Sequence, residues 1–453
     1  MAAAEKKDRY EYLTKTPVPE LIVRLSVPTI ISMLVTGIYN AADTYFVGQI
    51  PEAGTQATAA VGIVFPLMAV IQAIGFFFGH GSGNFLSRML GAGEKDKANE
   101  MASTGFALAL LFGVSFAVFG NIAIKPIVSF LASDDVSADT LRMTADYAGI
   151  ILLGAPFTMG QFVINNQLRF QGAAVYAMVG LMAGAVINMG LDPLLIFAFD
   201  MGVRGAAIAT ISGQIMSFCI LLIGAGKGEN IRIKFNRIRI NFYYIGQIIN
   251  GGAPSLFRQG LAAIATVLLN RSAGSLGADE AIAGMSIVTR VMMLVSSALI
   301  GFGQGYQPVC SFNYGAGLKK RVKEGFSFCV KWGTVFLTLV GIVCFVFAPQ
   351  IVRVFRDDDA VVAVGQVALR CQAVALPLLA VSVITNMMLQ SIGSGVKASI
   401  TSSARNGIFF IPAILILPEL FGLTGVEITQ TVADICAVAL AVPMGLSELK
   451  KME

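Results

Sequence analysis

The feature that most constrains this chain is a stretch of about twenty mostly apolar residues that recurs from one end to the other. At 1.5 Å per residue, an α-helix of that length crosses a hydrocarbon core of about 30 Å. Hydrophobic residues make up 56% of the chain and charged residues only 13%, whereas a soluble domain has about a quarter charged residues. The pattern excludes a soluble protein and predicts an all-α polytopic membrane protein of about twelve transmembrane helices.

The predicted spans are residues 21–47, 57–80, 102–124, 143–166, 175–199, 205–225, 243–270, 281–305, 327–350, 367–391, 400–420 and 426–446. The segments between them are too short to fold as a separate soluble module. The first apolar stretch follows a charged segment and lacks a small-residue cleavage site, so it is interpreted as a first span rather than a signal peptide.

An internal repeat relates the two halves of the chain. GHGSG at 79–83 precedes LGAG at 90–93, and GFGQG at 301–305 precedes YGAG at 314–317, at an offset of about 222 residues. Other pairs at nearly the same offset are Pro28 with Pro254, Gly62 with Gly284, Pro126 with Pro349, Pro156 with Pro377, and Gly172 with Gly393. Because the offset covers an even number of helices, two homologous six-helix bundles should insert in the same orientation, related by a pseudo-two-fold axis along the membrane normal.

The repeat and the loops predict five regions. These are a cytoplasmic N-terminal segment (1–20), an N-lobe of spans one to six (21–225), a cytoplasmic linker (226–242), a C-lobe of spans seven to twelve (243–446) and a cytoplasmic tail (447–453). Lysine and arginine gather on the side of the termini, for example at 232–239 and 319–323, which predicts cytoplasmic termini in the plasma (inner) membrane. The net charge of +5 is therefore interpreted as topogenic, and no nucleic acid is expected as a partner.

Two bundles leave a cleft near the bilayer midplane that can open to each side in turn, which predicts a transporter of small molecules. A channel would need a filter of carbonyls or charged rings, and no segment resembles one. A membrane-embedded enzyme is disfavoured, because a single histidine excludes HExxH zinc chemistry and no Ser-Gly pair carries the glycine two places earlier that an intramembrane serine protease shows. No Walker lysine is present, so ATP is not the direct energy source. We expect a monomer in the lipid bilayer that needs no cofactor.

Two carboxylates stand within predicted spans, where an ionisable residue marks a functional site by default. Asp43 follows Tyr39 by four residues in the first span, and Asp192 follows Asn188 by four in the fifth, so each pair shares a helical face. Helix rise places both acids in the outer half of the first bundle. Ala206 and Thr210 in the sixth span and Tyr147 in the fourth fall at that depth too.

These groups are hard oxygen ligands suited to a small cation, or to a proton shared between the two acids. A structural explanation remains open for each of them. Asp43 could lie in the headgroup zone, Asp192 could cap a helix ahead of Pro193, and Asn188 could only join helices together.

Other polar residues give weaker indications. Those within or near second-half spans could line the cleft or could serve packing and topology: Arg258, Gln259, Arg290, Gln390 and Arg405. His80 ends an apolar run at the cytoplasmic edge and is expected to be interfacial.

Taken together, several segments resemble one family, the multidrug and toxic compound extrusion (MATE) transporters, from about residue 20 to 445. The segments are VPTIISMLVTGIYNAADTYFVG in the first span, SRMLGAG after the second, NMGLDPLLI in the fifth, GVRGAAIAT opening the sixth, APSLFRQG in the seventh and YGAG after the eighth. The resemblance implies a twelve-helix multidrug antiporter that alternates between inward-open and outward-open states, driven by inward flow of Na+ or H+.

Carried over by position, the resemblance implies a first-lobe cation site, able to hold Na+ if that is the coupling ion. Its residues are Asp43, Asn188, Asp192, the carbonyl of Ala206 and Thr210, with Tyr39, Asn40 and Tyr147 nearby. The sequence departs from the family pattern in two spans. The seventh span has Arg258 and Gln259 where some branches carry an acid, and Glu427 in the last span has no explanation. The alternative within the same superfamily is a flippase for lipid-linked precursors, although such proteins usually have more spans and a strongly cationic cavity.

Overall fold

The computed structural model describes residues 9–51, 53–132, 136–227 and 231–452, without the side chains of 40, 41 and 277–279. Twelve helical segments in these ranges are long and apolar enough to cross a membrane. They coincide in order and number with the predicted spans, which confirms the all-α, twelve-span fold.

The helices, in chain order, are α1 (Arg9–Lys15), α2 (Val18–Gly48), α3 (Gly54–Gly91), α4 (Lys95–Ile122), α5 (Ile124–Leu131), α6 (Ala138–Phe170), α7 (Ala174–Pro193), the π-turn η1 (Leu194–Ala198), α8 (Gly202–Ala225), the 3-10 turn η2 (Phe235–Arg237), α9 (Phe242–Gly315), α10 (Lys319–Val346), α11 (Ala348–Phe355), α12 (Asp359–Ser391), α13 (Gly395–Ser403), the π-turn η3 (Ala404–Ile408), α14 (Phe410–Phe421) and α15 (Leu423–Lys450). Long helix α9 contains two spans, Phe242–Leu276 and Glu280–Gly315. The segments α7–η1 and α13–η3–α14 are one span each.

Helix α3 extends well beyond the apolar stretch that predicted it. Helix α3 continues to Gly91, so His80 lies inside it and is fully buried, stacked on Phe76 with its edge toward Phe170. The expectation that His80 is interfacial was wrong, because hydropathy marks where a helix meets lipid and not where it continues inside its own bundle.

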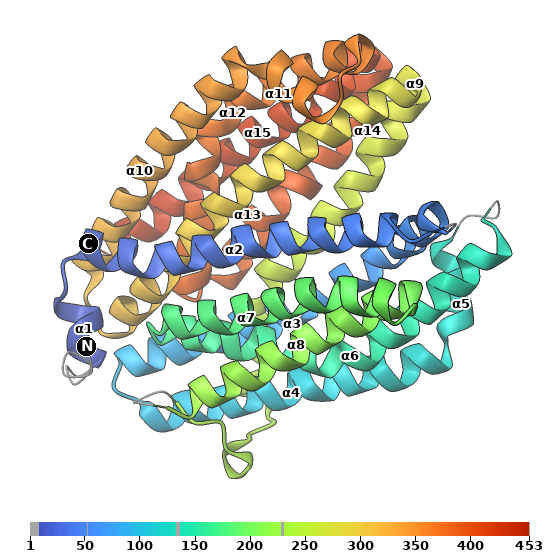
Figure 1. Cartoon of the computed structure of the whole chain (residues 1–453). Coiled ribbons are helices and arrows are strands. Elements are labelled where there is room, and N and C mark those ends of the chain that lie inside the picture. Colours follow the sequence, from blue (N-terminus) through green and yellow to red (C-terminus); the bar gives the residue numbers. More distant parts are fainter. Residues whose placement is uncertain (1–8, 52, 133–135, 228–230, 453) are drawn as a thin grey trace. The chain divides into compact units, whose positions relative to one another are not determined.

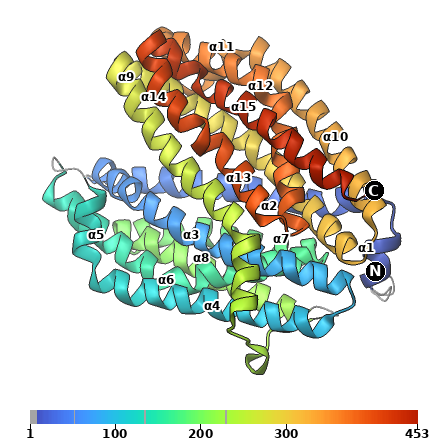
Figure 2. The ribbon, with the colours of Figure 1, turned by 180° about the vertical axis from the view of Figure 1, so that it is seen from behind.

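The chain divides into two compact units, one of residues 31–252, called the N-unit, and one of residues 1–30 with 253–453, called the C-unit. In the N-unit α6 packs against α3, α4, α7 and α8 (Figure 1). In the C-unit α12 packs against α10, α11, α13 and α15, as Figure 2 also shows from behind. These central helices are the most buried spans of their units, 72% for α6 and 56% for α12, and each unit has its own apolar core.

The repeat seen in the sequence is present in the backbone. Glycines with positive φ recur in equivalent turns: Gly93 with Gly317, Gly172 with Gly393, and Gly202 with Gly422. A buried hydrogen bond recurs as well, because the Asn165 amide donates to the Ala177 carbonyl (2.9 Å) and the Asn386 amide donates to the Ala398 carbonyl (2.6 Å). The two halves are therefore homologous six-helix bundles in structure as well as in sequence.

The borders of the units fall inside α2 and α9, after Ile30 and after Gly252. In the C-unit the first part of α2 packs closely on the end of α9, where the Ser26 hydroxyl donates to the Phe302 carbonyl (3.0 Å). A Cβ added to Gly305 would lie 2.2 Å from Ser26 Oγ, so a side chain there would force the helices apart. The N-unit has the matching contact, since a Cβ on Gly81 would lie 2.4 Å from the Ile248 carbonyl oxygen at the start of α9.

Candidate cation site

The sequence-predicted acids meet at one end of the N-unit, the end where α2 finishes at Gly48, which we call the distal end. Asp43 stands in the last turns of α2, and Asp192 is next to the final residue of α7. Thr210 lies in the first turns of α8, which starts at Gly202, and Tyr147 lies in the first third of α6. Four helices therefore each contribute a polar group at the same level.

The two carboxyl groups are buried and within electrostatic range of one another. Asp43 is 8% exposed and Asp192 is fully buried. Asn188 lies one turn before Asp192 on α7, and its amide donates to Asp192 Oδ1 at 3.4 Å. The spacing of four residues predicted this shared face, and the helix provides it.

Three oxygen atoms in this cluster are buried without a hydrogen-bond partner among the described residues: Asp43 Oδ1, Asn188 Oδ1 and Asp192 Oδ2. A buried acceptor that has no donor costs free energy, more so when it belongs to a carboxylate. A cation or a proton would satisfy these atoms. The cluster therefore has the chemistry of a binding site for a cation or a proton.

Neutral oxygens complete the cluster. Thr210 interacts with both the Asp43 carboxyl and the Tyr147 hydroxyl. Tyr147 is fully buried, and its hydroxyl also approaches the sulfur of Met68 (4.0 Å). Tyr39 lies on α2 within electrostatic range of Asp43. Carboxylate, amide and hydroxyl oxygens are the ligands that hard cations prefer.

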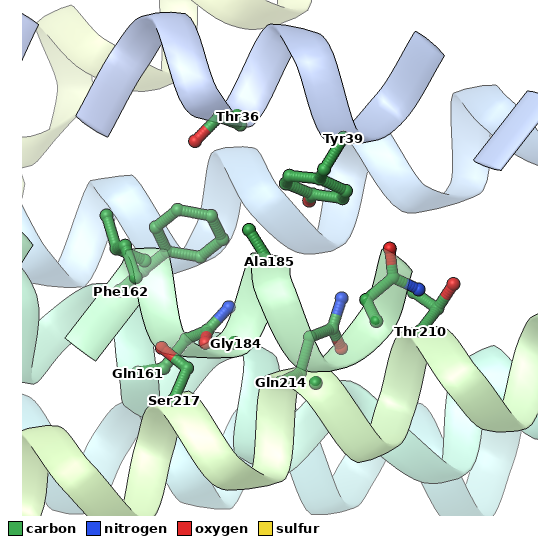
Figure 3. A pocket seen from close by; sticks show the side chains of 12 residues that line it. Thr36, Tyr39, Gln161, Phe162, Gly184, Ala185, Thr210, Gln214 and Ser217 are labelled. Carbon is green, nitrogen blue, oxygen red and sulfur yellow. The ribbon is translucent and has the colours of Figure 1, made fainter. Parts of the chain in front are cut away.

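A small cavity of about 40 Å³ continues from this cluster along the interior of the N-unit, between α2, α6, α7 and α8. Figure 3 shows Thr36 and Tyr39 of α2 on one side and Thr210 and Gln214 of α8 opposite them. Its volume is sufficient for a water molecule. Gln161 and Ser217 also line it, and each has a buried oxygen that finds no hydrogen-bond partner in the part of the chain that the structure describes. Polar, unsatisfied walls indicate a hydrated space next to the acids.

Irregular backbone fixes the position of Asp192. The π-turn η1 follows directly after Pro193, and π-turns of this kind are frequent at functional sites because they re-aim the neighbouring side chains. The first turn of α8 is pressed against η1, since a Cβ on Gly205 would lie 2.8 Å from the Leu195 carbonyl oxygen. Ala206 is consequently fully buried four residues before Thr210.

Among the described residues, no three His, Cys, Asp or Glu side chains gather into a metal cluster. A cation held by Asp43, Asn188, Asp192 and Thr210 would rest on two carboxylates and neutral oxygens, a donor set that suits Na+ or a proton better than a transition metal. The side chain of Asn40, the remaining predicted neighbour, is outside the described residues.

The second-half candidates differ in their burial and in their partners. Arg258 is half-buried, and its Nη1 has no hydrogen-bond partner in the described part of the chain, while Gln259 is also half-buried and Arg290 is exposed. Gln390 is fully buried, accepting from Gln307 (3.0 Å) and donating to Ser255 (2.9 Å), so it joins α12 to α9. Glu427 is buried on α15 beside Cys371 of α12.

Sequence reasoning missed Asp434, an acid in the middle of the last span. It is 6% exposed and bonded to Arg405 and Gln430. The signal was present, because Asp434 interrupts the apolar run TVADICAV just as Asp43 and Asp192 interrupt theirs. Asp434 has no second acid at a matching depth in a neighbouring span to mark it as part of a site, as Asp43 and Asp192 mark each other.

The chain is similar to known proteins over nearly its whole length. The MatE family model matches residues 28–194 and 254–415. Multidrug export protein MepA of Staphylococcus aureus is 28% identical over 445 residues, with 96% of this chain and 95% of the relative covered, and MepA of Staphylococcus saprophyticus is also 28% identical over 96% of this chain and 95% of the relative.

Solved structures agree with the sequence relatives. A structure described as the outward-facing conformation of a multidrug resistance MATE family transporter superposes with a TM-score of 0.91 at 26% identity, covering 99% of both chains. A transporter of the same superfamily from Pyrococcus furiosus superposes with a TM-score of 0.90 at 25% identity, covering 98% of this chain and 99% of the other. With twelve spans in two homologous bundles and a matching family model over most of its length, the chain belongs to the MATE family of multidrug transporters, which are membrane transporters and not enzymes.

Proposed function

We propose that this protein is an antiporter that exports small amphipathic or cationic organic compounds across the plasma membrane. Export is driven by Na+ or H+ moving inward through the N-unit site of Asp43, Asn188, Asp192 and Thr210. Both termini face the cytoplasm, and the protein works as a monomer by alternating access.

The observation that carries the proposal is the set of three orphaned oxygen atoms on Asp43, Asn188 and Asp192. A purely structural role would be expected to leave these acceptors paired, because an unpaired buried acceptor lowers stability. A site that loads and releases a cation needs acceptors that have no permanent donor. The cavity beside Asn188 and Thr210, which is lined by polar atoms without partners among the described residues, adds a hydrated space through which an ion could exchange.

The substrate class rests on the relatives, which carry the name multidrug export protein. The twelve spans favour export over a flippase for lipid-linked precursors, which would usually have more. The cytoplasmic orientation of the termini rests on the basic loops, such as Lys319, Lys320 and Arg321 at the start of α10.

The proposal is tested by efflux of a fluorescent cationic dye from proteoliposomes that hold the purified protein. A Na+ gradient and a proton gradient are imposed separately, each with the membrane potential clamped. We expect one of the two gradients to drive dye movement in wild type, and the same gradient to drive far less in Asp43→Asn at the ion concentration that saturates wild type. The matched control is Asp200→Asn, an exposed acid at the distal end of the N-unit, which should transport as wild type does. Dye movement at the same rate without any ion gradient would contradict the antiport mechanism.

A further inference from the structure

An ion pair is buried in the C-unit between its last two spans. Arg405 Nε donates to Asp434 Oδ1 at 2.7 Å, and the Gln430 amide donates to the same oxygen at 2.9 Å. The Asp434 side chain is 7% exposed and the Arg405 side chain 25%. Taking two charges out of water is unfavourable even when they pair, so the pair is not explained as a source of stability.

The pair lies near the middle of the last two spans, Gly395–Phe421 and Leu423–Lys450. Arg405 follows the start of α13 at Gly395, and Asp434 follows the start of α15 at Leu423. At 1.5 Å per residue each is about 15 Å from the end of its span, half of a hydrocarbon core of about 30 Å. Ionisable groups at that depth are rare and generally functional.

The backbone around Arg405 is irregular. The π-turn η3 covers Ala404–Ile408, and regular helix resumes at Phe410. A π-turn inserts one extra residue into the helix and changes the direction of the side chains that it carries. The span therefore departs from ideal geometry at the residue that meets Asp434.

The repeat identifies the N-unit counterparts of this pair. Gly202 and Gly422 open α8 and α15 with the same positive φ, which aligns Thr210 with Gln430 and Gln214 with Asp434. For the preceding span, the equivalent hydrogen bonds of Asn165 and Asn386 align Arg405 with Gly184.

All three counterparts, Gly184, Thr210 and Gln214, line the small cavity beside the N-unit acids. In the C-unit the equivalent positions hold a guanidinium, an amide and a carboxylate that are bonded to one another. Asp434 Oδ1 has two donors, whereas Asp43 and Asp192 each keep an oxygen to which no described residue donates. The N-unit thus has acids whose positive partner is not part of the chain, and the C-unit has an acid whose positive partner is a side chain of the same chain.

We propose that Arg405 is a tethered cation: its guanidinium does permanently for Asp434 what the coupling ion does transiently for the N-unit acids. Charge changes during the transport cycle are then confined to the N-unit, and Asp434 keeps its partner throughout. This inference rests on the proposed N-unit cation site, and the two are tested by different variants.

The first test removes the tether. Arg405→Ala leaves Asp434 buried with the space of a side chain beside it, so the purified protein should unfold on the order of 10 °C lower. Guanidinium chloride at millimolar concentration, far below denaturing levels, should restore most of that loss. Wild type should gain nothing, and neither should Arg353→Ala, which breaks an exposed ion pair with Asp359, nor the double variant Arg405→Ala, Asp434→Asn.

The tethered-cation proposal is overturned if Arg405→Ala unfolds at the wild-type temperature, or if guanidinium stabilises Arg353→Ala as much as Arg405→Ala. If Arg405→Ala does not fold, the decision passes to the neutral double variant Arg405→Gln, Asp434→Asn, which keeps hydrogen-bonding groups on both residues.

In proteoliposomes that double variant should move the same number of ions per dye molecule as wild type, with the same ion concentration at half-maximal rate. A changed ion-to-dye ratio would show that Asp434 exchanges its charge and would overturn the proposal. The proposed function has its own refutation, which is normal ion-driven transport by Asp43→Asn. In that case the guanidinium experiment would still test the role of Arg405.

Discussion

The change Asp43→Asn removes one negative charge from the N-unit site and keeps the size and shape of the side chain. Asp43 is 8% exposed, and its Oδ1 has no hydrogen-bond partner in the described structure, so most of its role would be electrostatic. At an effective dielectric of about 20, a unit charge about 4 Å from a cation contributes about 4 kcal/mol. The amide oxygen of asparagine retains part of this attraction. We therefore expect a loss of about 3 kcal/mol, which is roughly a hundredfold weaker ion binding.

The assay is the ion concentration that gives half-maximal dye efflux, measured in proteoliposomes with matched amounts of protein. Asp43→Asn should raise it roughly a hundredfold and leave expression, insertion and thermal unfolding close to wild type, because the substitution also removes a poorly solvated buried charge. Asp192→Asn should act in the same direction. Asp200→Asn controls for the chemistry of the substitution, and its positive φ of 52° is one that asparagine tolerates.

A half-maximal ion concentration within about twofold of wild type in both Asp43→Asn and Asp192→Asn would refute the electrostatic reasoning, since two charges would then contribute less than about 0.5 kcal/mol.

Three further predictions follow from the packing and the topology. In a background without the six native cysteines, a thiol reagent should label Lys95→Cys and Lys319→Cys only from the cytoplasm and Thr55→Cys only from outside. Labelling of positions 95 and 319 from opposite faces would disprove the parallel repeat. Gly113→Val should lower the stability of the protein by about 1–3 kcal/mol, because a Cβ at Gly113 would lie 2.5 Å from Pro156 Cα. Gly246→Ala, where a Cβ would meet nothing within 4 Å, should be neutral or slightly stabilising. Equal unfolding temperatures of the two variants would contradict the α4–α6 packing. Asn165→Ala and Asn386→Ala should each cost about 1–3 kcal/mol, since each removes a buried amide that donates to a carbonyl of the following helix. A loss in only one of them would argue against equivalent roles.

The membrane fold could be predicted from the sequence because hydrophobic thickness sets helix length. All twelve spans were predicted. The sequence repeat could be recognised because its two copies keep glycines at turns that need a positive φ, such as Gly172 and Gly393. The short helices α5 and α11 were not predicted as separate elements, although the paired prolines Pro126 and Pro349 lie in their first turns. Each of these helices begins only two residues after the preceding helix ends, so the apolar run continues across the break and conceals it.

The candidate site could be predicted in part, because helix rise alone placed Asp43, Asp192 and Thr210 at one depth. Depth does not give the direction in which a side chain points, so it could not predict which oxygens lack donors. The same limit hid the C-unit pair: Arg405 was noticed as a polar residue near a span, but its partner Asp434 depends on the π-turn η3 and on the packing of α15. Tertiary contacts of this kind are not encoded in hydropathy or spacing.

The central claim is that the N-unit acids convert ion binding into a change of conformation, and a cation does this only if it binds the two states unequally. The most direct measurement is the distance distribution between spin labels on Lys95→Cys and Lys319→Cys in proteoliposomes, with and without Na+ and at low and high pH. We expect a distribution that shifts with at least one of the two ions in an otherwise wild-type protein. The shift should be preserved in the control Asp139→Asn, Asp200→Asn and lost in Asp43→Asn, Asp192→Asn. An ion-dependent shift that survives in this last variant would contradict the claim, because the coupling ion would then bind elsewhere.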